Sequence, residues 1–161
     1  MSDDLGHPED LLFQDIGQLI DAAKQRAAMA VNAELTLLYW HIGKRIQTGV
    51  LEGQRAEYVQ QVIHQLSQKL TQAYGKGWSQ QQLRHCLFFA ETFPNAEIIS
   101  ALRRQLTWTH IKTLMYVDDP LKRDFYIEIC RLEGWSSRQL QESISSIRRS
   151  SVPVVAFSHS S

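Results

Sequence analysis

The sequence lacks long apolar runs, closely spaced cysteines and a basic N-terminus. No apolar stretch approaches the ~20 residues that a membrane-spanning helix needs, and the acidic start of the chain does not resemble a secretory signal. Its two cysteines, Cys86 and Cys130, lie far apart, and neither has a second cysteine at a zinc-binding spacing. We therefore expect a cytoplasmic protein with no membrane partner and with two buried free thiols.

The sequence motifs of common catalytic sites are also missing. It contains no Gly-rich phosphate loop, no Gly-x-Ser-x-Gly and no His-Glu-x-x-His. Asp118 and Asp119 are adjacent acids, but their position before Pro120 is typical of a helix start. Four histidines lie singly in helical patterns, where surface or hydrogen-bonded core positions are the common outcome: His41, His64, His85 and His110. We predict no enzyme activity, no catalytic residue, no cofactor and no metal site.

Charge is balanced overall but unevenly distributed. The 161 residues contain 17 Lys and Arg and 17 Asp and Glu. Six of the acids and none of the bases fall within residues 1–21, which leaves a mildly basic body with a charge balance of +6. Such a body is compatible with nucleic-acid binding, and equally with a surface that only keeps the protein in solution.

One motif occurs twice. Gly77–Leu83 and Gly134–Leu140 both read Gly-Trp-Ser-x-x-Gln-Leu. Ser followed three residues later by Gln is a capping box at a helix start, and a preceding Gly suits the end of the helix before it. Each copy therefore predicts two helices joined by a tight turn, with Trp filling the corner. This is a helix-turn-helix outline, although two well-capped corners of an ordinary helical domain would read the same way.

Apolar residues at three- and four-residue steps predict an all-α domain over residues 10–149, with no strand. The first helix is expected from Asp10 to about Gly49, either as one long, bent helix or as two with a kink near Asn32 or Gly43; the pattern favours one. It is followed by a compact bundle of about five to six shorter helices with starts or caps at Arg55, Ser79, Glu97, Thr107 or Thr109, Asp119 and Ser136. Residues 1–9 and 150–161 are predicted to be disordered ends.

The helices that follow the two corners carry the candidate binding residues. Lys and Arg can meet phosphates, and Gln or Arg can reach base edges, for which Gln81 and Arg138 are the candidates. The Glu142 carboxylate weakens this prediction, and a solvated polar face is the alternative. The predicted DNA-binding set is Lys76, Gln81, Arg84, Arg138, Arg148 and Arg149, and a second basic patch contains Arg103, Arg104 and Lys112.

The four tryptophans are predicted to belong to the core. They lie near helix corners, where a large ring fills the space between two helices. A stacking platform for single-stranded nucleic acid would instead need them exposed in one groove. The residues are Trp40, Trp78, Trp108 and Trp135.

A series of short motifs resembles the N-terminal domain of the YhcG-like family of bacterial proteins assigned as nucleases. The resemblance covers about residues 10–149 and lies in the order and spacing of the motifs. Trp78 stands where the family more often has Phe, and Thr107 and Thr109 where it often has Ser. The motifs are Tyr39–Ile46, Tyr74–Ser79 with Leu83, Phe89, Phe93-Pro94, Leu106–His110 with Leu114, Arg123–Tyr126 and Trp135–Leu140.

The resemblance implies a helical DNA-binding module that normally precedes a nuclease domain of the restriction-endonuclease type. The sequence shows Ser150–Ser161 where the family continues into that domain, which suggests a stand-alone or truncated recognition half. The function expected is therefore binding of double-stranded DNA without catalysis. The alternative is a protein-interaction module, in which the long N-terminal helix forms a homodimer or meets another protein.

Overall fold

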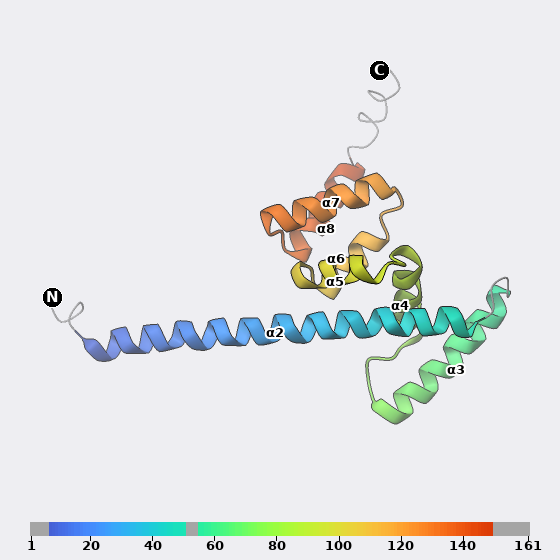
Figure 1. Cartoon of the computed structure of the whole chain (residues 1–161), viewed down its shortest axis with the longest axis horizontal. Coiled ribbons are helices and arrows are strands. Elements are labelled where there is room, and N and C mark those ends of the chain that lie inside the picture. Colours follow the sequence, from blue (N-terminus) through green and yellow to red (C-terminus); the bar gives the residue numbers. More distant parts are fainter. Residues whose placement is uncertain (1–6, 51–54, 150–161) are drawn as a thin grey trace, which may run out of the picture.

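A computed structural model of the chain describes residues 7–50 and 55–149, and for Arg148 and Arg149 the backbone only. These residues are all-α, as predicted, and include no strand (Figure 1). Helix boundaries agree with the sequence pattern within two residues, whereas the predicted ends at 1–6 and 150–161 lie outside the described residues. The seven helices are α2 (Pro8–Gly49), α3 (Ala56–Tyr74), α4 (Gln80–Thr92), α5 (Ala96–Gln105), α6 (Trp108–Met115), α7 (Pro120–Glu133) and α8 (Ser137–Arg149).

Helix α2 is one continuous helix and runs past the rest of the molecule as a long rod (Figure 1). It starts with Pro8 in its first turn, where a missing N–H costs nothing, and Glu9 and Asp10 suit the positive end of the helix dipole. Only its C-terminal part packs on the body. Between Pro8 and Val31, a fully described stretch, no residue is buried. The long helix predicted from the sequence is thus confirmed, and half of it stands clear of the body.

Helix α2 approaches α4 very closely at Gly43. A Cβ added at this glycine would lie 1.9 Å from the Cys86 carbonyl oxygen and 2.9 Å from the Ala90 Cβ. Because a glycine is the only residue that permits such an approach, Gly43 sets the distance between the two helices. Trp40 fixes the same contact one turn earlier, since its buried indole Nε1–H donates a hydrogen bond of 2.7 Å to the Phe93 carbonyl.

The core has two parts, and α2 belongs to both. The larger surrounds Phe89 and includes Trp40 and Trp108, together with buried residues of α5 to α8. The smaller joins Ile46 of α2 to Ile63 of α3 and Leu83 of α4. Trp78 and Trp135 are half-buried and pack against the smaller and the larger part, respectively. All four tryptophans are therefore core residues, as predicted.

Both Gly-Trp-Ser corners form as capped helix starts. Ser79 accepts a hydrogen bond from the Gln82 backbone N–H at 3.1 Å. The second corner has the complete box, because the Gln139 amide oxygen also accepts from the Ser136 backbone N–H at 2.8 Å. Gly134 ends α7 in the left-handed region, with φ of 64°. The motif thus predicts the serine cap at both helix starts and the full corner at the second copy. At the first copy the preceding helix α3 ends earlier than the motif predicts, with Gly75 as its cap instead of Gly77.

Each corner is also held by a side chain from another part of the fold. The Trp78 carbonyl accepts a hydrogen bond of 2.7 Å from the Ser67 hydroxyl of α3. The Trp135 carbonyl lies 2.8 Å from Nε2 of His110 in α6. His110 Nδ1 accepts from the Thr107 backbone N–H, so Nε2 carries the hydrogen and donates to Trp135. His110 is therefore the hydrogen-bonded core residue that a single helical histidine was expected to be.

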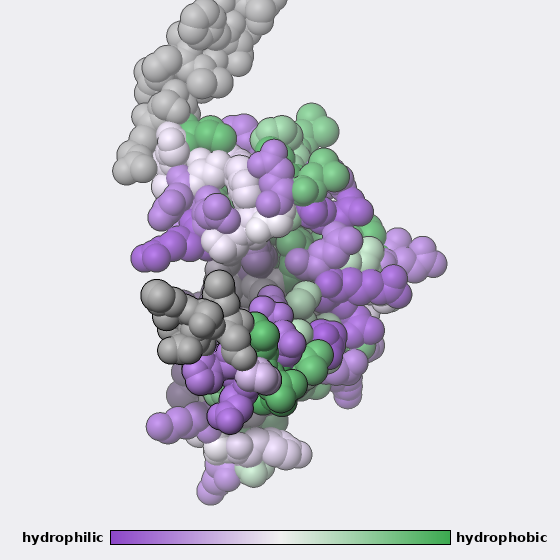
Figure 2. All heavy atoms as spheres, turned by 90° about the vertical axis from the view of Figure 1, so that its left-hand side faces the viewer, coloured by the Kyte–Doolittle hydropathy of each residue, from purple (hydrophilic) through white to green (hydrophobic). Residues whose placement is uncertain are grey.

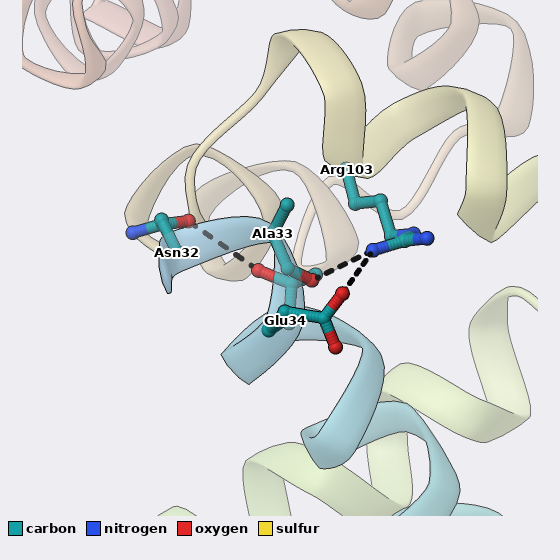
Figure 3. A network of polar contacts seen from close by, with 5 residues as sticks. Asn32, Ala33, Glu34 and Arg103 are labelled. Carbon is teal, nitrogen blue, oxygen red and sulfur yellow. Dashed lines mark hydrogen bonds and ion pairs between the residues drawn. The ribbon is translucent and has the colours of Figure 1, made fainter. Parts of the chain in front are cut away.

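Polar contacts tie α2 to the start of α6 and to α5. Asn32 accepts a hydrogen bond from the Trp108 backbone N–H at 3.0 Å, which adds to the cap that Thr107 provides. Figure 3 shows Arg103 of α5 reaching the Ala33 carbonyl and the Glu34 carboxylate of α2, at 3.4 and 3.5 Å. These contacts hold α2 where its exposed half leaves the body.

The two thiols are free and buried, as the sequence suggested. Burial raises the pKa of Cys86 to about 12 and also raises the pKa of Cys130. Since the thiolate is the reactive form, both are poor nucleophiles in the folded protein. Among the described helices, none is both long and apolar enough to span a membrane.

Candidate functional site

A cleft of about 430 Å³ opens between α4, α6 and α8. It joins the helices that follow the two Gly-Trp-Ser corners, because His85 comes from α4 and Gln141 from α8. Helix α6 and the residues after it form its floor. The lining residues are His85, Thr109, Lys112, Thr113, Tyr116, Val117, Gln141 and Ile144. The two helices that begin at the repeated motif therefore both contribute residues to one cleft, although no residue of the motif itself lines it.

On the α4 side of the cleft, a histidine and two aromatic side chains are in contact with one another. The His85 Nδ1 lies 2.7 Å from the Tyr116 hydroxyl, within hydrogen-bonding distance. Phe88, one turn away from Arg84 on α4, stacks on the Tyr116 ring with centroids 4.8 Å apart. These contacts hold the Tyr116 ring against α4, and the residue remains about half exposed. The tyrosine is thus a positioned, accessible ring beside a hydrogen-bonding imidazole.

The electrostatic environment of the cleft is positive. Burial, followed by the charges of Lys112 and Arg84, lowers the pKa of His85. Both cations therefore act on the same imidazole from α6 and from α4. Lys112 also lies over the Trp108 ring, with Nζ 5.9 Å from the centroid. Among the described residues that line the cleft, Lys112 carries a positive charge and none is a carboxylate. Two acids, Asp118 and Asp119, line the neighbouring cleft.

The structure separates the predicted binding residues. Arg84 is exposed on α4 next to His85 in sequence, and its charge acts on that imidazole. Lys76 is exposed in the connection before α4, and Gln81 is exposed in the first turn of that helix. Arg138 opens α8 one turn before Gln141, and its Nε lies 3.9 Å from the Glu142 carboxylate in an exposed pair. The side chains of Arg148 and Arg149, at the end of α8, lie outside the described residues.

The second basic patch expected from the sequence is not one surface. Arg103 points to α2 and bonds the Ala33 carbonyl and Glu34, so its role is to hold the fold. Arg104 is exposed on α5. Lys112 instead lines the cleft between α4 and α8. Residues that are close in sequence therefore have different roles: Arg103 makes a structural contact, and Lys112 lines the candidate site.

Tyr116 is the site residue that sequence reasoning missed. It caps the end of α6, four positions after Lys112, which places both near one face of that helix. That spacing was a usable signal, because Lys and Tyr at positions i and i+4 lie on the same side of α6, outside its apolar stripe. What the sequence did not reveal was that this face lies against His85 and Phe88 of α4.

The adjacent acids behave as predicted for a helix start. Asp119 accepts a hydrogen bond from the Leu121 backbone N–H at 3.0 Å and caps α7. Asp118, Asp119 and Lys122 line a neighbouring cleft of about 290 Å³. In the part of the chain that the structure describes, no three His, Cys, Asp or Glu side chains are grouped so that they could hold a metal ion.

Comparison with known proteins identifies relatives. Residues 15–149 match the family model described as the DUF1016 N-terminal domain. The chain is 29% identical to a protein of Escherichia coli strain K12 named "Putative nuclease YhcG", and the match covers 83% of this chain and 44% of the relative. The chain thus matches less than half the length of that protein. No solved structure gives a significant match.

Proposed function

The chain belongs to the DUF1016 N-terminal domain family, and we propose that it is a cytoplasmic, non-catalytic module that binds double-stranded DNA through the cleft between α4, α6 and α8. The name of the Escherichia coli relative describes a nuclease, and a nuclease has a nucleic acid as its substrate. A recognition role for the domain shared with that relative fits this activity, and the match leaves more than half of the relative outside it.

One observation carries the proposal: both helices that follow a Gly-Trp-Ser corner contribute to one cleft, whose described lining includes Lys112 and no carboxylate. Phosphate contacts from Lys and Arg supply most of the affinity of a DNA-binding protein and fix its register. Arg84 and Lys112 are candidates for this task, because the charges of both act on His85. Gln141 in the cleft and Gln81 at the start of α4 carry amide groups that suit base edges.

The remaining residues of the predicted binding set stay part of the proposal. Lys76 precedes α4, and its ammonium group would extend the phosphate contacts beyond Arg84. Arg138 is held only by an exposed pair with Glu142, which competes weakly with a phosphate. Arg148 and Arg149 follow on the same helix. In this arrangement α4 and α8 act as helix-turn-helix-like elements that flank the duplex.

Removing the two cations of the cleft tests the proposal. In the double variant Arg84→Ala/Lys112→Ala, binding to a mixed 30-base-pair duplex is expected to weaken strongly at low salt. The slope of log K against log salt should fall by about 2, because each phosphate contact contributes about 0.9 to that slope. Fluorescence anisotropy of a labelled duplex across a salt series measures both quantities.

A variant that removes the same charge elsewhere provides the control. Arg55→Ala/Lys69→Ala deletes two exposed cations of the α3 region, which contributes nothing to the cleft lining. It should retain most of the affinity and of the salt slope. If both double variants lose the same amount, binding depends on overall charge and the cleft is not the site. If the unaltered chain binds no duplex at low salt, the function itself is wrong.

The pH dependence of binding reports on His85. In the free protein its pKa is lowered, so the imidazole is neutral near pH 7. A phosphate beside it favours the charged form, and the pKa should therefore rise on binding. Binding then takes up a proton, and affinity should increase as pH falls from 7.5 towards the lowered pKa of the free protein. One coupled proton gives at most about a tenfold gain per pH unit.

Substitution by a residue that does not titrate isolates this effect. His85→Asn keeps a polar group near Tyr116 and should flatten the pH dependence of the dissociation constant between pH 5.5 and 7.5. His41→Asn changes an exposed histidine of α2 in the same way and should leave the dependence intact. An equal pH dependence in all three proteins would place His85 away from the bound phosphates.

A further inference from the structure

The exposed half of α2 has a continuous apolar face without a partner. Figure 1 shows this half leaving the body, and Figure 2, which faces its N-terminal end, shows hydrophobic side chains gathered there and bordered by hydrophilic ones. Phe13 is 79% exposed and Leu19 69% exposed, values that are unusual for such residues in a folded protein. The large exposed side chains are Leu11, Leu12, Phe13, Ile16, Leu19, Ile20, Met29 and Val31.

The size of this face is that of an interaction site. Residues 8–31 extend for about 36 Å at 1.5 Å per residue. A stripe covering a third of a helix ~10 Å wide then has an area of roughly 360 Å², within the range that marks functional patches on soluble monomers. An isolated helix of this length is marginal in water, and packing of its apolar face is what normally stabilises it.

The apolar residues of this face recur in a seven-residue pattern. The large ones lie in its N-terminal part and the small ones in its C-terminal part. Phe13, Ile16 and Ile20 occupy the inner positions of its N-terminal part. Ala23, Ala27 and Ala30 continue the same three- and four-residue steps, and all are exposed. Helices that pair through such a repeat place the inner residues of one into spaces on the other. The stripe therefore carries large side chains at its N-terminal end and alanines at its C-terminal end.

We infer that this face binds a second copy of the chain as an antiparallel pair of helices. In the register that opposes Phe13 to Ala30, Ile16 lies opposite Ala27 and Ile20 opposite Ala23. Each of the three large inner residues then meets an alanine, whereas a parallel pair would oppose Phe13 to Phe13 and leave empty space between alanines. Pairing large with small residues is what allows two facing layers to fill space without strain.

Charge supports the same orientation. Residues 8–21 contain four acids, Glu9, Asp10, Asp15 and Asp21, and no base. Residues 22–31 contain Lys24 and Arg26 and no acid. An antiparallel pair aligns the acidic half of one helix with the basic half of the other, while a parallel pair aligns acid with acid. It also places the two bodies, which pack on the C-terminal part of α2, at opposite ends of the pair (Figure 1).

The interface predicts a dimer that dissociates on dilution. Two stripes of roughly 360 Å² fall below the ~1,200 Å² of total buried surface that stable complexes reach, even after flanking side chains are added. Sedimentation equilibrium of the full chain between about 1 and 200 µM tests this. The weight-average mass should rise from 18.5 kDa towards twice that value.

Charge placed on the stripe should abolish association. Ile16→Glu/Ile20→Glu is expected to remain monomeric over the whole range, with its helix content in the body intact because neither residue contacts the core. The control Leu121→Glu/Leu132→Glu changes two equally exposed leucines of α7 and should dimerise like the unaltered chain. A chain that is monomeric at every concentration overturns the proposal, and so does a dimer that survives Ile16→Glu/Ile20→Glu.

Crosslinking establishes the orientation. In the antiparallel register residue 13 lies beside residue 30 of the other copy, whereas the two residues 13 lie about 25 Å apart along the axis. A short thiol crosslinker should therefore join Phe13→Cys to Ala30→Cys only when the two variants are mixed. Crosslinks within Phe13→Cys alone would show a parallel pair and contradict the proposal. The buried native thiols of Cys86 and Cys130 should not react. This test is independent of DNA binding.

Discussion

Replacing Gly43 by alanine is expected to destabilise the protein by an amount near the upper end of the ~1–3 kcal/mol typical of overpacked cores. An added Cβ would lie 1.9 Å from the Cys86 carbonyl oxygen. This neighbour is backbone, so α2 and α4 must separate. The separation would also stretch the bond between Trp40 and the Phe93 carbonyl. Urea unfolding followed by circular dichroism measures the loss as a lower midpoint.

A second glycine of α2 provides the matched control. Gly17 is helical too, but apart from its chain neighbours and the adjacent backbone of its own helix, no atom lies within 4 Å of a Cβ placed there. Alanine is favoured over glycine within a helix by about 1 kcal/mol. Gly17→Ala should therefore leave the unfolding midpoint unchanged or raise it slightly. If Gly43→Ala behaves in the same way, the two helices are not in the close contact that the structure shows.

Truncation of Phe89 is the second large effect, with an expected loss of about 3–5 kcal/mol. Phe89 is completely buried, and its ring lies 5.3 Å from Trp108 and 6.0 Å from Phe93, centroid to centroid. Alanine leaves a cavity between α4 and α6 that a rigid helical core fills only partly. Because domains of this size are stable by about 5–15 kcal/mol, Phe89→Ala should lose a large share of the total, measured by the same urea titration.

Phe125 offers the comparison at the surface. Its ring is 56% exposed on α7 and contacts Tyr126. Phe125→Ala removes the same atoms without opening a core cavity, and the expected change in unfolding free energy is below ~1 kcal/mol. Similar losses for the two variants would mean that Phe89 does not lie at the centre of the core.

The helices were largely predictable because their signals are local. Ser79, Asp119 and Ser136 each accept the backbone N–H that the capping pattern assigns to them. The apolar residues at three- and four-residue steps depend only on the local sequence. They are sufficient to predict where each helix begins and ends. The unbroken α2 followed from the same periodicity.

The arrangement of the helices was much less predictable. The closeness of Gly43 to Cys86, the anchoring of Arg103 on α2 and the stacking of Phe88 on Tyr116 all join residues far apart in sequence. Such contacts depend on which faces meet, and helical periodicity does not encode this. Arg84 was therefore proposed from its exposed helix face, while Tyr116 and the place of Lys112 in the same cleft became visible only in the fold. The DNA contacts of all these residues remain predictions.

The dependence of the core on α2 has a consequence for how the chain folds. The Trp40 bond to Phe93 spans 53 positions, and the Asn32 bond to Trp108 spans 76. A bundle in which successive helices pack together closes only short loops, and this is why helical proteins usually fold fast. Here the buried face of the first helix, α2, is covered only after α4 and α6 have formed and packed against it. Part of the search for native contacts in this all-helical chain is therefore long-range, although most of its contacts are local.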